Sequence, residues 1–80
     1  MDAFVELDVH GMTKVQALTA VDAKLRRADA SVYRLRIIHG YHGGTALRDG
    51  IRARYAAHAK VRRVELGLNP GQTDLVLREY

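Results

Sequence analysis

The protein has 80 residues and no cysteine, and its 13 Lys and Arg against 9 Asp and Glu give a net charge of +4 at pH 7. This length allows a single domain over residues 1–80, and the lack of cysteine excludes a disulfide framework or a zinc site built from thiolates. No apolar run is long enough to cross a membrane, and the first residues do not resemble a signal peptide. We therefore expect a cytoplasmic domain whose modest basic excess is compatible with nucleic acid and equally with solubility alone.

The first two elements predicted along the chain are a strand and a helix. Apolar and polar residues alternate over residues 5–9, the period-two pattern of a strand with one buried face. Thr13 and Gln16 have the spacing of a capping box. Apolar residues then recur at helical spacing, which predicts a helix over residues 14–28.

The rest of the chain predicts a second helix and three more strands. Thr45 can cap this helix, whose apolar stripe runs to His58. Gly50 in its interior costs roughly 1 kcal/mol relative to Ala, so packing must hold the helix together. The three strands are expected over residues 32–38, 61–68 and 73–78.

The predicted element order is β-α-β-α-β-β, which indicates an α+β fold. Strand–helix–strand connections favour parallel pairs with right-handed crossovers, and the tight turn at residues 69–72 makes the last strand antiparallel. Two helices can cover only one face of a four-stranded mixed sheet. Because each strand keeps one polar face, we expect a two-layer sandwich with an open, charged sheet surface.

Three segments are expected to converge at one edge of this sheet. The carboxyl ends of the strands that run parallel bring residues 8–11, 39–44 and 69–73 to the same side, where ligand sites form in α/β sheets. Both helix N-termini open there as well. Most of the histidines and glycines therefore gather at one end of the molecule.

The titratable candidates at this edge are Asp8, His10 and His39. The two histidines can be an acid/base pair or a phosphate clamp, because imidazole titrates near neutrality, or they can be ordinary strand-end histidines. Simple alternation puts His10 on the polar face and His39 on the buried one. Asp8 shares a strand face with His10, so it can orient a histidine, help to hold a metal ion, or be a solvated carboxylate.

The glycine-rich segment between the second strand and the second helix is a candidate phosphate site. Its amides and the helix dipole favour an anion, although the glycines can also serve only to make a tight turn. Lys14, Arg48 and Arg52 fall on early helical turns and can hold flanking phosphates. Four further arginines are assigned to the open sheet face, as a nucleic-acid footprint or as solvated charge: Arg34, Arg36, Arg63 and Arg78.

Three stretches carry a resemblance to a known family. LDVHG at 7–11, IIHGYHGGTALR at 37–48 and PGQTDLVL at 70–77 resemble the small MutS-related (Smr) domain. The resemblance implies a fold like that of the C-terminal domain of translation initiation factor three and nicking or cleavage of DNA or RNA. The glycine-rich segment is one residue longer than the usual family pattern and adds His42. Carried over by position, Asp8 and His10 match the family's Leu-Asp-Leu-His segment, His39 and Gly40 match its His-Gly-x-Gly segment, and Thr73 matches the Thr of its final strand. Together with the glycine-rich segment, this predicts Asp8, His10 and His39 as catalytic residues. The predicted phosphate-binding residues are Gly40, Tyr41, His42, Gly43, Gly44, Thr45, Arg48 and Thr73.

We therefore expect a nucleic-acid-binding domain with endonuclease activity. A histidine pair suits RNA, whose 2′-hydroxyl can be the nucleophile, whereas DNA needs an activated water and with it a divalent metal ion. No cofactor is certain from the sequence, and a divalent metal ion is compatible with it. The alternative is a non-catalytic module that binds nucleic acid or the ribosome, and a third hypothesis is a structural partner domain that uses the open sheet edge.

Overall fold

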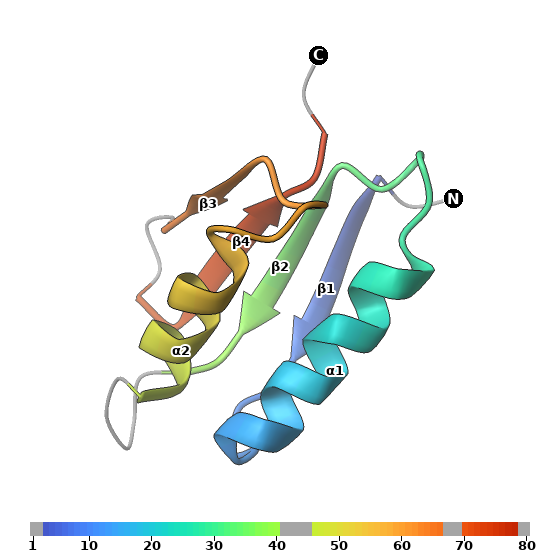
Figure 1. The fold of residues 1–80 in the computed structure, drawn as a ribbon. Coiled ribbons are helices and arrows are strands. Elements are labelled where there is room, and N and C mark those ends of the chain that lie inside the picture. The colour runs from blue at the N-terminus through green and yellow to red at the C-terminus, as the bar shows by residue number, and fades with distance from the viewer. Residues whose placement is uncertain (1–2, 41–45, 67–69, 79–80) are drawn as a thin grey trace.

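The computed structural model describes residues 3–40, 46–66 and 70–78 (Figure 1). The order of elements is the predicted β-α-β-α-β-β. The elements are β1 (Phe4–Asp8), α1 (Lys14–Arg27), β2 (Arg34–Ile38), α2 (Ala46–Tyr55), β3 (Arg63–Glu65) and β4 (Gln72–Val76). No helix in these residues is long and apolar enough to span a membrane.

The four strands form one mixed sheet in the order β1-β2-β4-β3. β1 and β2 pair in parallel, with Asp8 opposite Ile38 at their carboxyl ends. β4 pairs antiparallel with both β2 and β3. β2 and β3 thus run in the same direction, as predicted, but they are not neighbours, because β4 is inserted between them.

Both helices pack on the same face of the sheet, which confirms the two-layer architecture (Figure 1). The Thr13–Gln16 capping box is present at the start of α1, and this helix buries Ala17, Val21 and Leu25. α2 buries Ile51 and Tyr55, so these members of the predicted apolar stripe form the packing face. His58, predicted at the end of the same stripe, lies beyond the end of α2 at Tyr55.

Tyr55 links the two helices through its hydroxyl. The ring is fully buried, and the hydroxyl donates to Asp22 Oδ1 at 2.6 Å and lies 3.1 Å from the Leu18 carbonyl oxygen. Burial and the neighbouring Asp22 carboxylate raise the pKa of Tyr55 well above its ordinary value. The two helices are therefore joined by a satisfied polar contact between the Tyr55 hydroxyl and α1.

The third strand is shorter than the sequence pattern predicted. β3 covers Arg63–Glu65 instead of 61–68, and Leu66, expected on the buried face, is 53% exposed. The ladder to β4 ends with Glu65 opposite Asp74, so Leu66 lies beyond the paired part of this edge strand. Leu68 lies outside the described residues.

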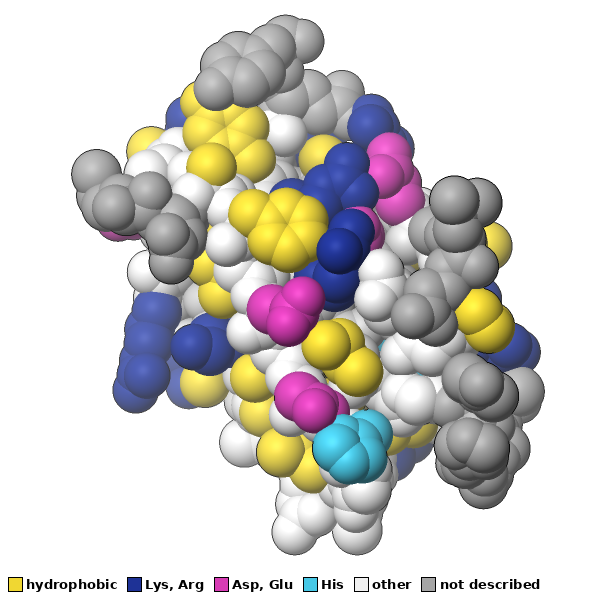
Figure 2. All heavy atoms as spheres, turned by 180° about the vertical axis from the view of Figure 1, so that it is seen from behind, with side chains coloured by type: hydrophobic (Ala, Val, Ile, Leu, Met, Phe, Trp, Pro, Cys, Tyr) yellow, Lys and Arg dark blue, Asp and Glu magenta, His cyan; other side chains and the backbone are white. Residues whose placement is uncertain are grey.

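The open face of the sheet carries an ion-pair network. Asp74 is buried, and it accepts from Arg34 at 2.7 Å and from Arg36 at 2.9 Å. Glu65 accepts from Arg34 and from Arg63, both at 2.7 Å. Figure 2 shows this face, where a central group of basic side chains lies beside carboxylates. The sequence-assigned footprint is therefore largely neutralised by carboxylates on β3 and β4.

Arg78 is not part of this network. It lies beyond the end of β4 and lines a cleft next to the C-terminal end of α1. Its placement on the open sheet face was wrong, because the strand ends at Val76 and the regular alternation ends with it.

Candidate functional site

Residues from three parts of the chain meet beyond the carboxyl ends of β1 and β2. The amides of His39 and Gly40 both donate to the Gly71 carbonyl, at 3.0 and 2.9 Å, so the turn before β4 is tied to the end of β2. The amide of Val9 donates to the Ile38 carbonyl at 2.9 Å, which extends the pairing of β1 and β2. The predicted convergence of segments is thus present, while Tyr41, His42, Gly43, Gly44 and Thr45 lie outside the described residues.

Asp8 and His10 form a hydrogen-bonded pair at the surface. His10 Nδ1 lies 2.5 Å from Asp8 Oδ1, and the same oxygen accepts from the His10 amide at 3.0 Å. The His10 side chain is 69% exposed and the Asp8 side chain 52%. Hydrogen bonds from His10 lower the pKa of Asp8, so this carboxylate stays ionised and accepts the Nδ1 proton. A neutral His10 ring therefore presents the lone pair of Nε2, which has no protein partner within the described ranges.

His39 lies on the opposite side of the sheet from His10. It is 4% exposed and continues the buried alternation of Leu35 and Ile37 on β2. Simple alternation had indicated this difference between the two histidines, and the structure confirms it. The structure therefore brings Asp8 and His10 together at the surface, whereas His39 is buried and bonded to Thr73 instead.

Both ring nitrogens of His39 are engaged. Nδ1 lies 2.8 Å from the Gly40 carbonyl oxygen, and Nε2 lies 2.9 Å from Thr73 Oγ1. A carbonyl oxygen can only accept, so Nδ1 carries the proton and, in the neutral ring, Nε2 accepts the Thr73 hydroxyl proton. His39 therefore links the backbone of Gly40 to the first residues of β4.

Thr73 and Arg52 complete this chain of hydrogen bonds. Thr73 is fully buried, and its Oγ1 accepts from Arg52 Nε at 3.0 Å. Burial, together with the nearby Arg48 charge, lowers the pKa of Arg52. The sequence pattern indicated phosphate contacts for Thr73 and Arg52, whereas the structure joins them to His39. Thr73 is 34 positions from His39 and 21 from Arg52 along the chain, so these contacts leave no local signal in the sequence.

Gly40 brings the backbone after β2 close to His10. Its φ of +73° lies in the left-handed region that favours glycine, and a Cβ built at Gly40 would lie 3.6 Å from His10 Cβ. Gly11 has a similar φ of +79°, but a Cβ there would meet nothing within 4 Å. A side chain at position 40 would thus reach His10, whereas one at Gly11 would not meet any neighbour within 4 Å.

Two basic side chains start from the first turns of the helices. Lys14 lies across α2 at Gly50, where an added Cβ would be 2.7 Å from Lys14 Cε and 3.5 Å from its Nζ. Arg48 is about one-third exposed and donates from Nε to Asp49 Oδ1 at 3.0 Å. Gly50, which weakens the helix by its low propensity, therefore leaves room for the Lys14 side chain.

A metal site is not assembled by the residues that the structure describes. Within them, no group of three or more His, Asp or Glu side chains is placed to hold a metal ion. The sequence-based cluster of Asp8, His10, His39 and His42 included one residue outside these ranges. The described members alone are split between the two faces of the sheet.

The geometry can be compared with known proteins. The model of the Smr domain family matches residues 7–72. The crystal structure of the Smr domain of Thermus thermophilus MutS2 superposes with a TM-score of 0.83 at 32% sequence identity, covering 94% of this chain and 99% of that one. Among curated proteins, none matches the sequence. Because the family model spans most of the chain and the matching fold has the same small two-layer form, this chain belongs to the Smr domain family.

Proposed function

We propose that the domain binds nucleic acid at the carboxyl edge of β1 and β2 and cleaves a phosphodiester bond within one strand. The observation that carries the proposal is the surface pair of Asp8 and His10, in which a carboxylate orients an exposed imidazole at 2.5 Å. This arrangement is typical of a general base whose tautomer is set by its partner. Membership of the Smr domain family, which is associated with nucleic-acid binding and nicking, supports the same reading.

The pair favours RNA as the substrate. His10 Nε2 takes the proton of a 2′-hydroxyl, whose oxygen attacks the adjacent phosphorus while the bond to the 5′-oxygen breaks. The leaving 5′-oxygen takes up a proton from water, and the His10 imidazolium returns its proton to solvent. The products are a 2′,3′-cyclic phosphate and a free 5′-hydroxyl. Asp8 stabilises the imidazolium that forms during proton transfer. Hydrolysis of DNA instead needs an activated water, for which a divalent metal ion is the usual source.

The remaining predicted site residues divide into two groups in this proposal. The amide-rich segment from Gly40 to Thr45, with Arg48 and Lys14, binds the phosphate that flanks the cleaved bond. His39 and Thr73 are positioning residues, because their mutual hydrogen bond holds Gly40 against the start of β4. This gives His39 a different part from the direct proton transfer that the family resemblance implies.

A cleavage assay with and without a chelator tests the proposal. Labelled single-stranded RNA and DNA of the same sequence are incubated with the protein in EDTA or in Mg²⁺, and the products are resolved by their termini. We expect RNA cleavage that persists in EDTA and leaves a cyclic phosphate. Loss of all cleavage in EDTA contradicts the metal-free route. Binding without cleavage under every condition supports the alternative of a non-catalytic module, which the interior position of His39 also favours.

Gly50→Ala is expected to separate stability from binding. Replacing a helix-interior glycine raises the free energy of unfolding by up to about 1 kcal/mol, but the added methyl group displaces Lys14, whose Cε lies 2.7 Å from the new Cβ position. We expect a higher melting temperature together with weaker binding of an RNA oligonucleotide. Lys14→Gln is the matched comparison, since it weakens binding without the gain in stability. Unchanged RNA affinity in both variants contradicts a phosphate contact by Lys14.

A further inference from the structure

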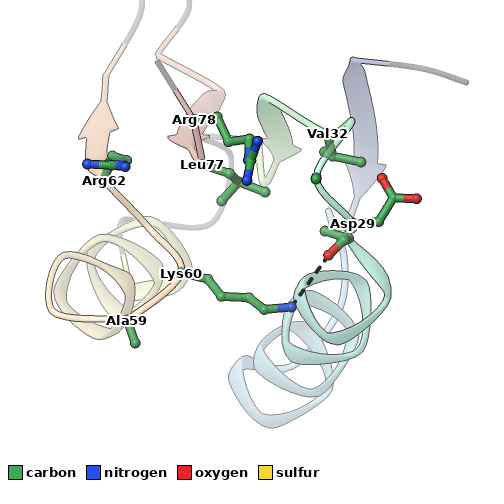
Figure 3. A pocket seen from close by; sticks show the side chains of 9 residues that line it. Asp29, Val32, Ala59, Lys60, Arg62, Leu77 and Arg78 are labelled. Atoms are coloured by element: carbon green, nitrogen blue, oxygen red, sulfur yellow. Dashed lines mark hydrogen bonds between the residues drawn. The ribbon is translucent and has the colours of Figure 1, made fainter. Parts of the chain in front are cut away.

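The end of the domain opposite the Asp8–His10 pair is strongly basic. A cleft between the C-terminal end of α1 and the chain that follows β4 is lined by Lys60, Arg62 and Arg78, with Asp29 at its edge (Figure 3). A neighbouring cleft between the helices adds Arg26 and Arg54. A third cleft, between α1 and the sheet, adds Lys24 and Arg27. These depressions share residues, so they form one surface, called here the basic end.

The basic end carries most of the unbalanced charge of the described chain. Its three clefts are lined by seven of the 13 Lys and Arg residues but by only two carboxylates, Asp22 and Asp29. Elsewhere in the described residues, six basic side chains are accompanied by five acidic ones. The small net charge of the chain therefore understates a local field of one sign.

The carboxylates at the basic end are already engaged. Asp29 Oδ1 accepts from the Ser31 amide and hydroxyl, at 2.8 and 2.5 Å. Asp22 accepts from Arg54 at 2.9 Å and from Tyr55. The side chains of Arg62 and Arg78, by contrast, have no hydrogen-bond or ion-pair partner in the part of the chain that the structure describes. These two guanidinium groups are available to an external anion.

The lining of the clefts favours a phosphate backbone over a protein partner. A specific protein interface needs an exposed apolar centre. The third cleft has apolar walls of Val5, Val32, Leu35 and Leu77, but these side chains are buried or half-buried in the core. None of the exposed large apolar side chains of the described residues lines the three clefts. Those side chains are Phe4, Met12, Val15 and Leu66. The cleft around Arg62 and Arg78 has alanine, valine and leucine in its walls but no aromatic side chain on which a base could stack. The chemistry fits repeated phosphates without base readout.

We propose that the basic end is a second contact surface for the sugar–phosphate backbone of a nucleic acid, separate from the cleavage edge. This inference rests on the proposed function for the choice of nucleic acid as the ligand. The position of the surface follows from the clefts and their charges instead. The longest dimension of the domain is 35 Å, about one turn of a duplex. One nucleic acid can therefore contact both ends of the protein at once. The second surface supplies affinity while the Asp8–His10 pair acts on the chain.

The experiment compares two neighbouring arginines. Arg62 lines the basic end, whereas Arg63 pairs with Glu65 on the open sheet face. Binding of a fluorescein-labelled RNA strand and of a 20-base-pair duplex is measured by anisotropy across a salt series for Arg62→Gln, Arg78→Gln and the control Arg63→Gln. The plot of log K against log salt has a negative slope, and each basic-end variant is expected to make it shallower by about 1. Each variant is also expected to weaken binding roughly tenfold at 0.1 M salt. The control keeps the wild-type slope.

Each outcome of this series decides the inference. Wild-type slopes in Arg62→Gln and Arg78→Gln contradict it, even if the protein cleaves RNA. Shallower slopes in these variants support the inference, even if no cleavage is found. A failure of the proposed cleavage is therefore distinguishable from a failure of this second contact surface. Direct binding of labelled polyglutamate that Arg62→Gln abolishes, with nucleic-acid binding unchanged, assigns the surface to an acidic protein and contradicts the inference. Absence of any wild-type binding to RNA or duplex at low salt contradicts both proposals.

Discussion

Replacement of His10 by asparagine is expected to slow RNA cleavage by about 10²–10⁴-fold, the usual contribution of a general base. Asparagine keeps a polar side chain at this exposed position, so binding and the melting temperature should change little. Single-turnover cleavage at saturating protein measures the chemical step, and anisotropy measures binding. An unchanged cleavage rate in His10→Asn with intact binding would show that this imidazole does not transfer the proton.

Asp8→Asn tests the same pair from its other side. An amide at position 8 can donate to Nδ1, which moves the ring proton to Nε2 and removes the lone pair that accepts the substrate proton. We expect at least a roughly tenfold loss of rate, with little further loss when Asp8→Asn is combined with His10→Asn, since residues acting as a unit are not additive. Glu6→Gln is the matched control, because Glu6 is an exposed carboxylate on the same face of β1. Equal losses in Glu6→Gln and Asp8→Asn would point to a general charge effect.

His39 makes a distinguishable contribution in this scheme. A positioning residue changes the cleavage rate through the placement of Gly40, without removing the ionisation that belongs to His10. His39→Gln should therefore lower the rate but keep the shape of the pH–rate profile, whereas Asp8→Asn should alter that shape. If His39→Gln changed the shape of the pH–rate profile in the same way as Asp8→Asn, His39 would be a proton-transfer group.

Asp74→Asn is expected to reduce the free energy of unfolding by about 2–3 kcal/mol, somewhat below the 3–5 kcal/mol typical of a fully buried pair. The carboxylate is 4% exposed, but Arg34 and Arg36 remain about 30% exposed and are partly solvated when it is lost. Urea denaturation followed by circular dichroism measures the change. Glu65→Gln is the control on the same face, and we expect it to cost less than about 1 kcal/mol because Glu65 is one-third exposed. Equal losses in the two variants would contradict the special role of the buried carboxylate.

The same carboxylate predicts how stability depends on pH. Burial by itself raises the pKa of Asp74, but Arg36 and Arg34 outweigh it, and the folded-state pKa lies below the ordinary value of 3.8. A group whose pKa is lowered by folding stabilises the protein above its unfolded pKa, and this stability is lost as pH falls through the folded pKa. The wild type should therefore lose stability below about pH 4, and Asp74→Asn should show a weaker dependence in that range.

Several features of the fold could be predicted because they arise from neighbours in the chain. The Thr13–Gln16 capping box and the presence of two helices were confirmed. Both could be predicted because capping and helical periodicity act over three or four residues. Alternation also placed His10 and His39 on opposite faces, which the structure bears out. The short β3 was not predicted, because its ends depend on where β4 stops pairing with it.

By itself, the sequence determined the order of elements, the edge at which they converge, and the Asp8–His10 pair, whose members are two residues apart on one strand face. Tertiary structure alone decided which basic side chains are free. Arg34 and Arg36 are neutralised by carboxylates 31–40 positions away, while Arg62 and Arg78 are left without partners in the described residues. The physical reason is strand register, which core packing sets across the whole sheet and which no local pattern contains.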